Sequence, residues 1–103
     1  MIVIETTVFT KLISQLMHDD QYRELQEHLI ENPESGDLIQ GSGGLRKIRW
    51  KLTGRGKRGG VRIIYYWALL ADQIRMLYVY SKTDQGDLTK DQVKVLRHIV
   101  EKW

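Results

Sequence analysis

The chain has 103 residues and a formal net charge of +3, with 16 Lys and Arg against 13 Asp and Glu. This length predicts a single domain that spans residues 1–103. The sequence contains no cysteine, which excludes disulfide bonds, a thiolate nucleophile and a zinc–thiolate site. It has no apolar run of the roughly 18 to 20 residues that would span a bilayer, and no basic segment of the kind that opens a secretory signal, so we expect a cytoplasmic protein.

The first elements are predicted from residues 2–17. Residues 2–4 are Ile-Val-Ile, a β-branched run that is typical of a strand. Apolar side chains then recur at helical spacing over residues 8–17, and the hydroxyl of Thr6 or Thr7 is suited to cap this helix.

A second helix is predicted directly after the first. Either Asp19 or Asp20 can cap it, its apolar positions lie within residues 22–30, and it ends before Pro33. Two short helices joined this closely suggest a helical hairpin that packs on a sheet. Residues 34–44 are polar and rich in glycine, and they are predicted to form a loop.

Three antiparallel strands are predicted from the β-branched and aromatic residues of segments 45–52, 61–68 and 74–80. A glycine-rich hairpin loop over residues 53–60 joins the first two. In the first strand, basic and apolar side chains alternate, which predicts one wet, cationic face and one buried face. The basic side chains are Lys47, Arg49 and Lys51, and the apolar ones are Ile48, Trp50 and Leu52.

The last element is predicted to be a helix that begins after Thr89. Gln92 follows three residues later, so the two side chains can form a capping box. The element order is then β-α-α-β-β-β-α, which indicates an α+β domain with a small antiparallel sheet packed by helices.

Positive charge is concentrated in residues 41–67. This segment holds half of the basic residues, and no carboxylate lies between Asp37 and Asp72, whereas acidic residues outnumber basic ones in the rest of the chain. Such a local field favours a polyanion, and a phosphate backbone in particular. The alternative is a solvated basic hairpin without a specific partner. The eight cations are Arg46, Lys47, Arg49, Lys51, Arg55, Lys57, Arg58 and Arg62.

Four aromatic residues lie near these cations and are candidates for stacking on unpaired bases, namely Trp50, Tyr65, Tyr66 and Trp67. Strand alternation allows only half of them to share a face with the cations. Trp50 alternates with Lys51 and Arg49, so we expect it in the core.

The basic segment contains no paired carboxylates, histidine pair or Ser-His-Asp set, so any catalysis there depends on lysine and arginine. Cleavage of RNA can proceed this way, because the 2′-hydroxyl of the substrate is itself the nucleophile. Lysine can then transfer protons and arginine can stabilise the charge on the phosphorane. A basic patch that only binds RNA would have the same residues.

Three segments together resemble the RelE/HigB superfamily of toxins from bacterial toxin–antitoxin pairs, with the closest likeness to the HigB branch. They are GGLRKIRWK, GKRGGVRIIYYW and LYVYSKTDQGDLT, and the resemblance extends over essentially the whole chain. It implies a RelE-like fold and a ribosome-dependent mRNA endonuclease that inhibits translation. It also implies catalysis without a metal or cofactor, the ribosome and mRNA as partners, and a cognate antitoxin of the helix-turn-helix type.

The resemblance assigns catalytic roles to three residues. Lys47 matches a lysine that transfers a proton, Arg62 matches the arginine that stabilises the scissile phosphate, and Lys82 matches a basic residue that closes the site. The expected RNA-binding residues are Arg46, Arg49, Lys51, Arg55, Lys57, Arg58 and Tyr66.

The chain departs from the RelE pattern at two positions. Thr83 replaces an arginine, and Thr89 stands where a late catalytic tyrosine is expected, so the general base and acid stay unassigned, with His98 as a further candidate. Two other functions stay open. One is a ParE-like poison of DNA gyrase, and the other is a non-catalytic RNA-binding domain.

Overall fold

The computed structural model describes residues 1–52 and 60–103. The predicted order β-α-α-β-β-β-α is confirmed, with one additional short strand before the central three. The elements are β1 (Ile2–Glu5), α1 (Thr7–Leu16), α2 (Asp19–Glu31), β2 (Asp37–Leu38), β3 (Leu45–Trp50), β4 (Val61–Ala68), β5 (Gln73–Ser81) and α3 (Lys90–Glu101).

The strands form one five-stranded sheet in the order β1-β5-β4-β3-β2. The three central strands are antiparallel as predicted, but β1 runs parallel to β5, so the prediction of a wholly antiparallel sheet is wrong at this edge. Contacts distant in sequence set the direction of β1. The Thr6 backbone N–H donates to the Met76 carbonyl at 3.0 Å, and the Thr6 hydroxyl donates to the Leu77 carbonyl at 2.9 Å.

Strand β2 lies within the segment that was predicted to be a loop. It consists of two exposed residues that pair with β3, Asp37 opposite Lys47 and Leu38 opposite Arg46. A strand this short has no alternating pattern from which it could be predicted.

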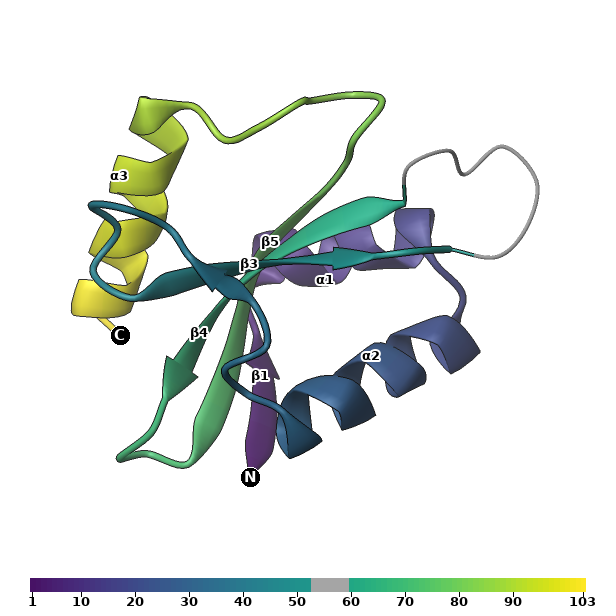
Figure 1. The fold of residues 1–103 in the computed structure, drawn as a ribbon, viewed down its shortest axis with the longest axis horizontal. Helices are drawn as coiled ribbons and strands as arrows, with labels where there is room; N and C mark the ends of the chain where they lie inside the picture. Colours follow the sequence, from purple (N-terminus) through teal and green to yellow (C-terminus); the bar gives the residue numbers. More distant parts are fainter. Residues whose placement is uncertain (53–59) are drawn as a thin grey trace.

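Helices cover both faces of the sheet, since alternate residues of β4 belong to different apolar clusters (Figure 1). On one face α1 and α2 pack against Ile63 and Tyr65 of β4, which confirms the predicted helical hairpin on a sheet. On the other face α3 packs through Leu96 against Ile64. The sheet is therefore the middle of three layers.

The helix caps agree with the sequence at two of three places. Thr6 accepts from Phe9 N–H at 3.0 Å, and Thr89 accepts from Gln92 N–H at 3.1 Å within the predicted capping box. The prediction that an aspartate caps α2 is wrong, because the N-cap is His18, whose backbone N–H donates to Gln21 Oε1. Asp19 and Asp20 instead lie in the first turn, where negative charge complements the helix dipole.

No helix within residues 1–52 and 60–103 is long and apolar enough to cross a membrane.

Candidate active site

Pairing of β3 with β4 brings three cations together on the α3 side of the sheet. Arg49 and Arg62 are register partners, and Lys47 lies two residues before Arg49 on the same face. Side chains that are directly opposite in such a pair have Cβ atoms roughly 4.5–5.5 Å apart. The face is assigned by the neighbours, because Ile48, Val61 and Ile63 all pack into the cluster under α1 and α2. We call Lys47, Arg49 and Arg62 the cation cluster.

The members of the cation cluster differ in burial. Arg62 is only 5% exposed, Lys47 is half-buried and Arg49 is exposed. A guanidinium keeps its charge when buried, so Arg62 places a fixed positive charge at the base of the site. Arg49 and Lys47 extend that charge towards solvent.

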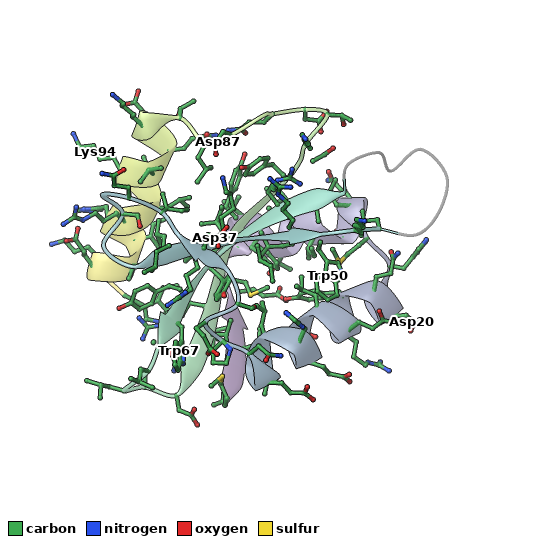
Figure 2. The ribbon with its side chains drawn as sticks, viewed as in Figure 1. Asp20, Asp37, Trp50, Trp67, Asp87 and Lys94 are labelled. Carbon is green, nitrogen blue, oxygen red and sulfur yellow. The ribbon has the colours of Figure 1, made fainter. Side chains whose placement is uncertain are left out.

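Asp87 supplies a carboxylate to this cluster from a distant part of the chain. Lys47 Nζ lies 3.2 Å from Asp87 Oδ1, which also accepts from the Leu88 backbone N–H at 2.8 Å. The Leu88 amide, the Lys47 ammonium and the charge of Arg62 hold the pKa of Asp87 below its usual range. Asp87 lies on the segment that arches from the end of β5 to α3 (Figure 2). Sequence reasoning missed it, because 40 residues separate the two partners.

The segment between β5 and α3 is held by its own polar side chains. Gln85 Nε2 donates to the Asp87 carbonyl at 2.8 Å and also to Gln92 Oε1, which is part of the α3 capping box. Asp87 is therefore presented to Lys47 from a braced loop.

Tyr80 also belongs to this site. It is the register partner of Arg62 on β5 and is only 5% exposed. Its hydroxyl is enclosed and has no hydrogen-bond partner among the described residues. Burial and the charge of Asp87 raise the pKa of Tyr80, whereas the charge of Arg62 lowers it.

A β-bulge explains why sequence reasoning also missed Tyr80. Ile64 pairs with Tyr78 and Tyr65 pairs with Met76, so Leu77 is an extra residue in β5. The bulge shifts the alternation of β5 by one position. Tyr80 consequently faces α3 with Arg62 instead of facing α1.

Lys82 and Lys51 lie at the ends of the strands that carry the cluster. Lys82 follows β5, is exposed, and donates its backbone N–H to the Gly60 carbonyl at 3.5 Å. Lys51 follows β3 and is also exposed. Lys82 comes two residues after Tyr80, the register partner of Arg62, and Lys51 comes two residues after Arg49.

Arg46 and Tyr66 are not brought to the cation cluster. Arg46 alternates with Lys47, and its Nη1 donates to the carbonyls of Glu34 at 3.0 Å and Gly36 at 2.8 Å, so this side chain fastens the loop after α2. Tyr66 shares the α3 face but lies four residues beyond Arg62, with the Arg75 guanidinium 5.9 Å from its ring centroid.

The remaining residues that the sequence suggested for the site are not part of the cation cluster or lie outside the described residues. Trp50, Tyr65 and Trp67 pack on the α1–α2 face, which confirms the expectation for Trp50. The Thr83 hydroxyl forms a hydrogen bond with the Ser81 hydroxyl. His98 lies in the last turn of α3, at the opposite end of that helix from Thr89. Arg55, Lys57 and Arg58 lie outside the described residues.

The cation cluster is suited to bind a phosphodiester. Two arginines and one lysine leave the same face of the sheet from adjacent strands. The residues that the structure describes contain no group of three or more His, Cys, Asp or Glu that could hold a metal ion. Arginine forks match phosphate oxygens, and an ammonium can donate a proton to a leaving oxygen.

No family model matches the chain. Among solved structures, the chain is similar to the E. coli toxin RelE, a mutant with two arginines replaced, in the free state. The TM-score is 0.60 at 13% sequence identity, and the match covers 96% of this chain and 95% of that chain. The α+β fold is therefore RelE-like over nearly its whole length, as the motifs implied.

Proposed function

We propose that this protein is a toxin of a toxin–antitoxin pair that cleaves mRNA on the ribosome. The observation that carries the proposal is the convergence of Lys47, Arg49 and Arg62 on one face of a RelE-like sheet. Two adjacent strands contribute these three cations, and the three motifs of the sequence resemble those of the same superfamily.

In this proposal the RNA supplies its own nucleophile. The 2′-hydroxyl gives up its proton to solvent and its oxygen attacks the phosphorus, the bond from phosphorus to the 5′-oxygen breaks, and the products are a 2′,3′-cyclic phosphate and a 5′-hydroxyl. Arg62 and Arg49 stabilise the negative charge that builds up on the non-bridging oxygens. Lys47 donates a proton to the 5′-oxygen as it leaves, and Lys82 extends the positive charge at the rim.

The motif resemblance favours the HigB branch and an antitoxin of the helix-turn-helix type. Both assignments belong to the proposal. Observation of a small helix-turn-helix reading frame beside this gene, and copurification of its product with the toxin, would support them.

Primer extension on a defined mRNA tests the proposal directly. Purified protein is incubated with the mRNA alone and with the same mRNA on programmed ribosomes. We expect new cut sites only with ribosomes. Cuts on naked mRNA would support the nuclease activity but would show that it does not require the ribosome. The absence of cuts in both reactions would contradict cleavage, and inhibition of gyrase supercoiling or salt-dependent RNA binding would then identify the rival functions.

A further inference from the structure

The Tyr80 hydroxyl is a buried polar group that the fold does not use. The side chain is 5% exposed, the hydroxyl is enclosed, and no group within residues 1–52 and 60–103 hydrogen-bonds to it. A buried hydroxyl without a partner lowers stability, because it has lost its bonds to water. Such a group calls for a specific explanation.

Tyr65 shows how the same fold treats a buried tyrosine in a structural role. Its ring is fully buried, and its hydroxyl donates to the Pro33 carbonyl and accepts from the Gly36 N–H, both at 2.8 Å. Tyr65 thus fastens the loop after α2. Tyr80 has no comparable bond, so its hydroxyl does not serve the packing of the free protein.

In the described part of the chain, Trp67 Nε1 is also enclosed and without a hydrogen-bond partner. Tyr80 differs from Trp67 in its position. Trp67 lies on the α1–α2 face, away from the cation cluster. Tyr80 is directly opposite Arg62, whose guanidinium side chain leaves the same face of the sheet. A phenolic O–H at this place can donate to an anion that the arginine attracts.

The Asp87 carboxylate already shows where an anion sits in this site. It lies 3.2 Å from Lys47 Nζ, and its charge together with that of Arg62 acts on Tyr80. The Asp87 side chain is 72% exposed, and exposed ion pairs are weak. A phosphate can therefore compete with the carboxylate for Lys47.

We propose that Tyr80 is a phosphate-binding residue of this site, whose hydroxyl donates a hydrogen bond to a non-bridging oxygen of the phosphodiester held by Arg62. In the free protein the Asp87 carboxylate occupies the neighbouring anion position on Lys47. The identity of the phosphodiester as RNA rests on the proposed function. The anion site itself does not.

The test compares Tyr80→Phe with the wild type and with Tyr78→Phe. Tyr78 is a suitable control because it is a half-buried tyrosine two residues away on the same strand, with its ring centroid 5.8 Å from that of Tyr80. Two probes are used. Binding of inorganic phosphate is measured as an increase in Tm. The second probe is a short RNA with 2′-O-methyl sugars, which can bind but cannot be cleaved.

Without ligand, we expect the Tm of Tyr80→Phe to equal or exceed that of the wild type. With inorganic phosphate, we expect the increase in Tm to be largely lost in Tyr80→Phe and retained in Tyr78→Phe. The affinity for the RNA falls about tenfold or more, which is the size of one hydrogen bond to a charged group.

Three results would overturn the inference. The first is a lower Tm of the unliganded Tyr80→Phe protein, which would reveal a structural bond. The second is an RNA affinity equal to that of the wild type, and the third is an equal loss in Tyr78→Phe. Failure of the proposed function would give a different result. If the wild type binds the RNA through Tyr80 but cuts no mRNA on ribosomes, the anion site is supported and only the nuclease function is contradicted.

Discussion

Arg49 of β3 and Arg62 of β4 are register partners that leave the same face of the sheet, with Lys47 beside them. Like charges directly opposite each other in an antiparallel pair are unfavourable. Their positions alternate with Ile48 and Ile63, which pack in the core, so neither arginine can move to the other face without exposing that core. The arrangement is therefore a stable part of the fold that favours binding of an anion.

Replacement of Arg49 by threonine should separate stability from binding. Threonine is a good strand residue and removes the repulsion, so the free energy of unfolding should rise by about 0.2–1 kcal/mol. RNA binding should weaken, and the slope of log K against log salt should become less steep by about 0.7. Urea denaturation and a salt titration measure the two effects. Replacement of exposed Lys94 on α3 by threonine is the control. An unchanged salt slope for Arg49→Thr would show that Arg49 does not contact the RNA.

Tyr65→Phe should destabilise the protein, in contrast to Tyr80→Phe. Loss of the Tyr65 hydroxyl leaves the Gly36 N–H and the Pro33 carbonyl without this partner, which costs about 1–3 kcal/mol. Urea denaturation of both variants measures the difference. A Tyr65→Phe protein as stable as the wild type would show that water satisfies these groups equally well.

Asp87→Asn should strengthen the binding of phosphate. Asparagine can keep the bond from Leu88 N–H but carries no charge, so Lys47 becomes available to the ligand. Since the Asp87 side chain is exposed, we expect a gain in RNA affinity of up to about fivefold and a change in stability below about 1 kcal/mol. Weaker RNA binding by Asp87→Asn would show that the carboxylate supports the ligand and does not compete with it.

The same ion pair gives a pH dependence with a defined sign. The folded pKa of Asp87 is lowered, so its contribution to stability is present above the ordinary carboxyl pKa of 3.8 and is lost as the pH falls through the folded pKa. The Tm difference between wild type and Asp87→Asn should therefore shrink below pH 3.8. A difference that persists unchanged into stronger acid would contradict the assigned cause.

Gly60→Ala should disturb the end of the β3–β4 pair that carries the cluster. Gly60 has φ +65°, and a Cβ atom there would lie 2.2 Å from the Trp50 carbonyl oxygen. Left-handed backbone alone costs about 1–2 kcal/mol for a residue with a side chain, and the clash adds to this. The control is Gly86→Ala, where a Cβ meets nothing within 4 Å, and we expect its Tm to stay close to that of the wild type. Equal Tm values for the two variants would contradict this account.

Much of the fold could be predicted from local pattern. Alternation in residues 45–50 correctly separates Lys47 and Arg49 from Ile48 and Trp50, and the capping box of Thr89 is where its spacing indicates. These features depend on neighbours within a few residues, so the local sequence contains the necessary information.

The rest depends on contacts that are distant in the chain. The bulge at Leu77 reverses the faces of the last residues of β5, and no composition signal marks it, so Tyr80 could not be assigned to the site. Asp87 pairs with a lysine 40 residues away. Arg46 had the same composition signal as its neighbours, but the loop after α2 supplies carbonyls that engage it.

The central claim is that the cation cluster cleaves mRNA, and Arg62→Met tests it most directly. Methionine keeps most of the buried volume while removing the charge, and exposed Arg23→Met on α2 is the control for loss of an arginine elsewhere. Circular dichroism and Tm establish that both variants fold. Primer extension on programmed ribosomes should then show wild-type cutting by Arg23→Met and cutting slower by about 10² to 10³ fold by folded Arg62→Met. Cutting at the wild-type rate by folded Arg62→Met would contradict the account.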